Sequence, residues 1–332
     1  MVGAVVVSAL PAAENKLPQA SHGSDARRAA FRLLLSSAFF ALMATGAKVA
    51  TRRLPGSEVA LVRFLTGIVV VIGAVALRHA SLRPRRWGWL LARGIFGGTA
   101  VVLYFASIGA APVSVATLLN QTQPVFTMLS SWLLLREQPR RVALAALVLT
   151  LAGVVAIVGV RHLTLGSWRG ELLGVASAIG SGIAITSVRA SRRASTDGTP
   201  PETTWSVFFS FTFLGALVTV PTVLPPLGQW VAPTAGEWAL LSGVALASVA
   251  AQVIMTEAIG HLTGVQSGII SQLTVPMTVA IGMVFLGERL TVSYVVGAAL
   301  IESGVTLTIL AAGARARARV APPPDTHDPV IS

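Results

Sequence analysis

The chain has 332 residues, of which 54% are hydrophobic and only 11% are charged, and it carries a net charge of +12. Soluble domains carry about 25% charged residues because they need a hydrated surface, so this composition excludes an ordinary soluble domain and indicates a membrane protein. The chain has no cysteine, which excludes disulfides and thiolate metal sites.

Long apolar segments recur along the chain, each of roughly the 20 residues that a helix needs to cross a bilayer core. In chain order the predicted spans are residues 32–51, 58–77, 89–108, 114–135, 141–160, 171–189, 205–224, 238–259, 264–286 and 292–310. We therefore expect an all-α integral membrane protein with ten transmembrane helices.

Basic residues concentrate in alternate loops of this arrangement. An even number of spans puts both termini on one side of the membrane, and the loops on that side hold most of the 25 Lys and Arg residues. Because cytoplasmic loops carry the excess of Lys and Arg, we expect both termini in the cytoplasm and the protein in the cytoplasmic (inner) membrane. Charges spread over several loops form no single basic face, which argues against nucleic acid as a partner.

The two halves of the chain repeat the same landmarks. The matching pairs are Pro124 with Pro276, Glu137 with Glu288, Gly153 with Gly304, Glu58 with Glu202, and Phe64 with Phe208. We expect one five-span repeat at residues 29–165 and a second at 166–314, between a flexible cytoplasmic arm (1–28) and a cytoplasmic tail (315–332). Since five is an odd number, the second repeat is inverted. Inverted repeats are typical of secondary transporters, whose substrate binds near the bilayer midplane where the repeats meet.

The order of these landmarks resembles that of EamA-type members of the drug/metabolite transporter (DMT) superfamily, which have two tandem five-span repeats. Pro124 with Glu137 and Pro276 with Glu288 carry the resemblance, which covers roughly residues 32–312. It implies a metabolite carrier with a central cavity between the halves and alternating access. Members of the superfamily handle amino acids, sugars, nucleotide conjugates and drugs, so the resemblance leaves the substrate open. Glu302 departs from the pattern, which favours an apolar residue there.

Polar side chains inside the spans are candidates for lining a cavity, because lipid cannot hydrogen-bond them. The fourth span holds Thr117, Asn120, Gln121 and Pro124 on one helix face with Gln123 beside them, the ninth holds Ser271, Gln272 and Pro276, and the third and eighth add Tyr104 and Gln252. Each proline breaks a helical hydrogen bond, and amides both donate and accept, which suits a small polar solute. The alternative is that these groups bond between helices and hold the bundle together.

Four charged residues inside the spans are further candidates: Lys48, Arg63, Glu257 and Glu302. Lys48 and Arg63 lie near span ends, where they could extend to the headgroups. Arg63 could instead bind an anion or pair with Glu58. Glu257 and Glu302 could take up a proton during transport, bind a cationic substrate or pair with a neighbouring helix.

These observations predict a secondary transporter that exports a small polar, amino-acid-like metabolite by alternating access. A passive channel, or a non-transporting receptor or assembly protein, is the alternative. The sequence has no His-Glu-x-x-His pair and no span that combines a serine with a histidine at recognisable spacing. We therefore expect no enzyme, no catalytic residue, no metal and no cofactor. The partners expected are the solute and the lipid bilayer, with a monomer or a homodimer equally open.

Overall fold

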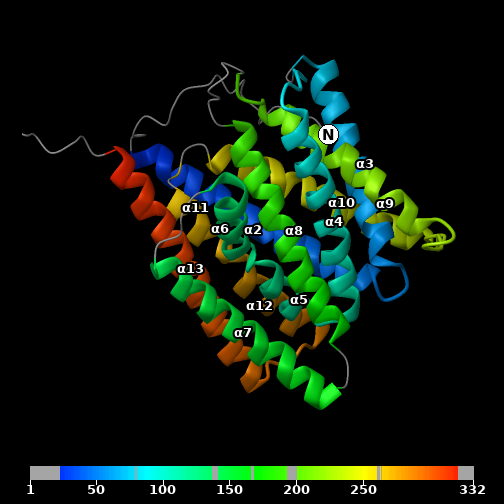
Figure 1. The fold of residues 1–332 in the computed structure, drawn as a ribbon. Helices are drawn as coiled ribbons and strands as arrows, with labels where there is room; N and C mark the ends of the chain where they lie inside the picture. The colour runs from blue at the N-terminus through cyan, green and yellow to red at the C-terminus, as the bar shows by residue number, and fades with distance from the viewer. Residues whose placement is uncertain are drawn as a thin grey trace, which may run out of the picture.

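The computed structural model describes residues 23–78, 81–136, 141–165, 168–192, 200–259, 262 and 264–320. Throughout these residues the regular structure is helical, without strands (Figure 1). The helices are α2 (Gly23–Ala50), α3 (Gly56–Ala76), α4 (Trp87–Ala110), α5 (Val113–Asn120), α6 (Gln123–Leu135), α7 (Arg141–Leu165), α8 (Arg169–Arg192), α9 (Thr204–Val223), α10 (Ala235–Ile259), α11 (Gly264–Gln272), α12 (Thr274–Leu286) and α13 (Val292–Val320). Glu137 lies outside the described residues.

Eight segments within the described residues are apolar and long enough, at 19 to 24 residues, to cross a bilayer. They correspond to eight of the ten predicted spans and make the chain a multi-pass membrane protein. The other two predicted spans differ. The fourth is divided into α5 and α6, and the fifth, α7, contains a shorter apolar stretch, Leu144–Ile157. The all-α fold is confirmed, while ten crossings and the inversion of the second half stay predictions.

The outer surface of the bundle is apolar, as a lipid-facing surface must be. Large side chains such as Leu133, Val284 and Val292 are 72%, 76% and 81% exposed. In water such a surface would drive aggregation, whereas lipid tails solvate it without cost. The inside is packed around two apolar clusters, one near Phe64 and Phe105 and one near Leu118 and Ile301.

Helices from the first half of the chain pack directly on helices from the second half. Helix α4 packs on α8 and α9, α2 packs on α10, and α7 lies beside α13 (Figure 1). Glycines bring some of these backbones together: a Cβ atom on Gly98 would lie 2.6 Å from the Cα of Gly215, and one on Gly153 would lie 2.6 Å from the carbonyl oxygen of Gly297. Small residues of this kind allow membrane helices to make close van der Waals contact.

Two helices are interrupted at corresponding places in the two halves. Helix α5 ends at Asn120 and α6 begins at Gln123, and α11 ends at Gln272 just before α12 begins. Pro124 and Pro276 lie in the first turns of α6 and α12, where a proline is tolerated because the missing N–H has no intrahelical partner. The two prolines therefore lie at the start of a new helix segment in each half.

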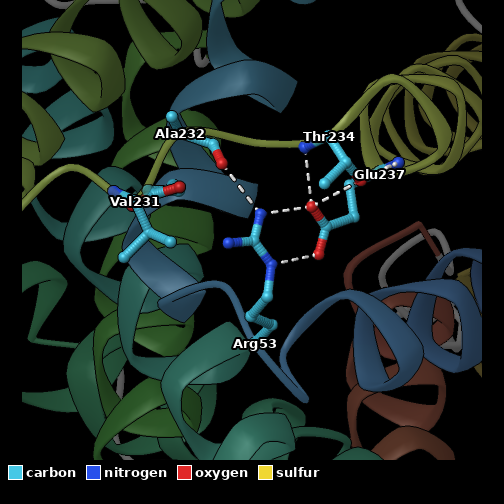
Figure 2. Close-up of polar contacts among 6 residues, drawn as sticks. Arg53, Val231, Ala232, Thr234 and Glu237 are labelled. Atoms are coloured by element: carbon cyan, nitrogen blue, oxygen red, sulfur yellow. Dashed lines mark hydrogen bonds and ion pairs between the residues drawn. The ribbon is translucent and has the colours of Figure 1, made fainter.

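The connection between α9 and α10 is fastened to the first half by charged groups (Figure 2). Arg53 pairs with Glu237 and donates to the carbonyl oxygen of Ala232 at 2.8 Å. Glu237 also accepts from the backbone N–H of Thr234 at 2.7 Å. The hydrogen bond between Arg53 and Glu237 raises the pKa of the Arg53 guanidinium. The carboxylate of Glu58 accepts from the N–H of Val231 at 2.6 Å.

Candidate functional site

The two helix interruptions contact each other through amide side chains. Gln121, directly after α5, donates from Nε2 to the carbonyl oxygen of Ser271 at 3.2 Å and to Oε1 of Gln272 at 3.4 Å. Gln272 in turn donates to Oε2 of Glu302 on α13 at 3.4 Å. The candidates Gln121, Ser271, Gln272 and Glu302 thus form one polar row that joins the first half to the second.

Glu302 gives this row an acidic end inside the bundle. Its Oε1 atom is buried and has no hydrogen-bond partner among the described residues. Irregular backbone within a bilayer is tolerated only where protein covers it or where it lines a wet cavity. A polar row at two such interruptions can exchange its hydrogen bonds with those of a polar solute, because amides both donate and accept.

The amide of Asn120, next to Gln121, is bonded to a neighbouring helix. Asn120 donates to the hydroxyl of Ser177 on α8 at 2.7 Å, and Ser177 donates to the carbonyl oxygen of Ala100 on α4 at 2.7 Å. Nearby, the hydroxyls of Tyr104 and Thr117 lie 2.9 Å apart and connect α4 to α5. These short bonds favour the bundle-holding role for Asn120, Tyr104 and Thr117.

Lys48 is bound to the end of α4. Its Nζ atom donates to the carbonyl oxygens of Ile108 and Ala111, each at 2.7 Å. The last carbonyls of a helix lack intrahelical partners, and a cation there also compensates the negative end of the helix dipole. Lys48 therefore caps α4, a role for which its position near the end of the first span gives no sequence signal.

Arg63 lies in the wall of a small pocket formed by α3, α9 and α10. Gln252 and Thr212 line the same pocket, together with the ring of Phe208. The Nε atom of Arg63 donates to the hydroxyl of Ser248, whereas its buried NH1 nitrogen has no partner among the described residues. Of the alternatives for Arg63, the pairing with Glu58 is not formed, because the carboxylate of Glu58 accepts from Val231 in the α9–α10 connection.

A second arginine, Arg93 on α4, lies over the ring of Phe211, which Arg63 also approaches. The guanidinium carbon of Arg93 lies 4.1 Å from the ring centroid of Phe211, and that of Arg63 lies 5.4 Å from it. The Nε atom of Arg93 is buried without a hydrogen-bond partner in the described part of the chain. From sequence, Arg93 is recognisable only by its place inside the third predicted span.

Aromatic contacts partly offset the cost of placing these charges in the membrane. A charge at the centre of a span costs roughly 2.5–3.5 kcal/mol on insertion scales, and less toward the span ends, where Arg63 lies. A cation–π contact returns about 0.5–2 kcal/mol, the upper value applying to desolvated pairs. Arg63 lies 5.6 Å from the ring centroid of Phe64 in addition to its contact with Phe211, which Arg93 shares. The buried nitrogens without a partner, NH1 of Arg63 and Nε of Arg93, are the part of the cost that these contacts leave uncompensated.

The structure indicates no role for the two remaining candidates, Gln123 and Glu257. Gln123, at the start of α6, is half-buried and makes no side-chain hydrogen bond with the described residues. Glu257 lies on α10 at a position whose side chain is outside the described part of the structure, so its role stays a prediction.

Comparison with known proteins places this architecture among transporters. The model of the EamA-like transporter family matches the chain twice, at residues 27–159 and 168–310. The pseudopaline exporter of Pseudomonas aeruginosa strain PAO1 is 28% identical over 235 residues, which are 69% of this chain and 77% of the exporter. Human solute carrier family 35 member G1 is 27% identical over 212 residues, 61% of this chain and 57% of that protein. One solved crystal structure shares the fold, with a TM-score of 0.57, 22% identity, and coverage of 88% of this chain and 99% of that chain.

Proposed function

The chain belongs to the EamA-like transporter family, and from that membership we propose that it exports a small polar metabolite across the cytoplasmic membrane by alternating access. The two tandem family matches support two repeats, and with five crossings in each the second repeat is inverted. A relative described as an exporter supports the outward direction. Both termini then lie in the cytoplasm, on the side of the basic loops.

The observation that carries this proposal is the contact between the two helix interruptions. Discontinuous helices whose broken ends meet between two repeats are the usual substrate and ion sites of secondary transporters. Gln121 and Gln272 are the side chains that meet there, one from each half. We assign both to the substrate site, together with Glu302, the acidic residue to which Gln272 donates a hydrogen bond.

The lengths of the hydrogen bonds distinguish long, weak contacts from short ones. The bonds that Gln121 and Gln272 make are 3.2 to 3.4 Å long, at or beyond the upper end of the usual range of about 2.7–3.2 Å for N–H···O bonds. The bond from Asn120 to Ser177 and the main bonds of Lys48 are 2.7 Å long. Exchanging a weak bond for one to a solute costs little, so the row at the interruptions is where a substrate enters and where the halves separate.

Counterflow in proteoliposomes tests the proposal. The purified chain is reconstituted, loaded with an unlabelled amino acid, and assayed for uptake of the same labelled amino acid, across a panel of polar amino acids and their derivatives. A carrier gives saturable uptake that is accelerated by solute on the opposite side. We expect this behaviour for at least one solute, with a several-fold loss in Gln121→Ala and Gln272→Ala and none in the exposed control Arg52→Ala.

Linear uptake without acceleration from the opposite side identifies a passive channel and contradicts the proposal. Absence of flux for the whole panel, from vesicles in which the protein is shown to be folded, favours a receptor or assembly role instead.

A further inference from the structure

We propose that the pocket beside Arg63 and Arg93 binds the anionic group, a carboxylate or a phosphate, of the transported solute. This rests on the proposed transport function and adds to it a substrate class and a second contact point. The polar row at the helix interruptions would hold the neutral polar part of the same solute.

The donors that an oxyanion requires are present and unused. Arg63 is only 8% exposed, and its NH1 nitrogen is buried without a partner. The Nε atom of Arg93 is in the same condition. A guanidinium presents its N–H groups as a planar fork that can bond to the oxygens of a carboxylate or phosphate. The fork of Arg63 has its Nε on Ser248, so each arginine offers one buried nitrogen without a partner, and an anion beside the ring of Phe211 can accept from both.

Among the described residues no ion pair joins Arg63 or Arg93 to an acidic group. The carboxylates that the structure describes bond to other groups: Glu58 to the N–H of Val231, Glu202 to the N–H groups of Arg85 and Arg86, Glu237 to Arg53, and Glu302 to Gln272. One oxygen each of Glu58, Glu202 and Glu302 is buried without a partner. Two like charges in a low-dielectric interior repel each other and each lacks hydration. An external anion relieves both penalties at once.

The rest of the pocket wall indicates what the anion is attached to. Phe208 and Phe211 supply apolar surface, and Thr212, Ser248 and Gln252 supply polar groups. Small-molecule sites combine apolar walls with a few polar groups that fix orientation. The pocket is formed by α3 of the first half and by α9 and α10 of the second, and Arg93 of α4 lies against Phe211 in its wall. Its volume is about 10 Å³, room for one water, so its walls have to separate before the anionic group of a solute can enter and contact both halves.

Matched pairs of an acidic and a neutral solute test the proposal. The full-length protein, purified in detergent without added lipid, is heated with L-glutamate or L-glutamine, succinate or succinamide, and O-phosphoserine or serine. A ligand that binds only the folded state raises the Tm. We expect at least one acidic member to raise the Tm more than its neutral partner does. We expect Arg63→Gln and Arg93→Gln each to weaken that acidic member's binding about tenfold or more, because hydrogen bonds to charged groups are lost.

Two further variants separate binding from folding. Arg63→Lys keeps the charge but loses the fork, so an intermediate affinity is expected. Arg52→Gln removes the same charge from an exposed position outside the pocket and should leave the shift unchanged. If Arg63→Gln fails to fold, the acid-specific rise in Tm is compared in Arg93→Gln and Arg63→Lys instead.

Any one of three results would overturn the proposal. The first is equal stabilisation of the wild type by the acidic and the neutral solute of each pair. The second is an acid-specific rise in Tm that survives in both Gln variants, and the third is an Arg63-dependent rise that only added phosphatidylglycerol produces, which would make the pocket a lipid headgroup site. Counterflow of a neutral solute by the wild type would leave the transport function standing in each case. Conversely, Arg63-dependent binding of an acidic solute without counterflow would overturn the transport function alone.

Discussion

Glu58 and Glu202 fasten equivalent loops of opposite halves. Glu58, in the first turn of α3, accepts from the N–H of Val231 in the loop that leads into α10. Glu202, just before α9, accepts at 2.5 Å from the N–H groups of both Arg85 and Arg86 in the loop that leads into α4. The two glutamates occupy matching places in the sequence repeat, and each reaches across to the other half. Their reciprocal contacts support the proposed pseudo-symmetry of the repeats.

The first prediction concerns the stability that these two glutamates supply. An N–H that loses its acceptor costs about 1–3 kcal/mol when fully buried. The three N–H groups here are partly buried, so Glu58→Ala and Glu202→Ala should both lower the Tm in detergent through a smaller cost of the same kind. Glu202→Ala should lower it more, because Glu202 holds two N–H groups and Glu58 holds one. A Tm for Glu202→Ala equal to that of the exposed control Arg52→Ala would contradict the assignment.

The second prediction concerns the contact between α7 and α13. A methyl group on Gly153 would lie 2.6 Å from the carbonyl oxygen of Gly297 and 2.8 Å from the side chain of Ile301. Gly153→Ala should therefore force the helices apart and cost about 1–3 kcal/mol, as overpacking does. Gly243 on α10 has open space where its Cβ would be. Gly243→Ala should leave the Tm unchanged or raise it slightly, since alanine favours helix. Equal Tm values for the two variants would show that the close approach is not tight.

The third prediction distinguishes neighbouring residues at the first interruption. Asn120→Ala loses a 2.7 Å bond to Ser177 and should lose about 1 kcal/mol of stability. Gln121→Ala loses only bonds of 3.2 and 3.4 Å and should leave the Tm within a degree or two of wild type, while lowering counterflow several-fold. Thermal unfolding and counterflow on the same preparations measure both. The reverse ranking would place the substrate at Asn120 instead.

The fourth prediction assigns Lys48 to structure and not to the solute. Lys48→Met leaves the carbonyl oxygens of Ile108 and Ala111 without their donor and should cost about 1.5–3 kcal/mol, the range for bonds to a charged group. The Km for the solute, measured at a temperature where the variant is folded, should stay at the wild-type value. A large rise in Km with an unchanged Tm would instead make Lys48 a substrate contact.

Hydropathy is enough to predict the membrane class and most of the helices, because a bilayer fixes the length and composition of whatever crosses it. The repeat of Pro124 at Pro276 also marks where the helices are interrupted, since proline constrains its own backbone wherever it occurs. The sequence does not predict which groups the polar side chains bond to. Nothing local to Arg63 indicates that it bonds to Ser248 on α10 rather than to Glu58, five residues away along the same helix.

The same limit explains the division among the amides of the fourth predicted span. Their spacing puts Asn120 and Gln121 together as candidate cavity residues, yet one side chain is fixed to α8 and the other reaches α11. Adjacent helical residues point about 100° apart, so which of them faces the second half depends on where α8 and α11 pack. That placement is a property of the assembled bundle and has no signature in a segment of the sequence.

The packing of α2 on α10 has a consequence for how the protein is made. Helix α2 is released from the ribosome and inserted into the lipid long before α10 is translated, so the hydroxyl of Ser36 must wait for its acceptor, the carbonyl oxygen of Ala251. The charge of Arg63 waits in the same way for Ser248. The early helices therefore enter the bilayer before the polar partners that hold them in the finished bundle have been made. Any contact that substitutes for those partners has to form during that interval, before the last helices arrive and the bundle closes.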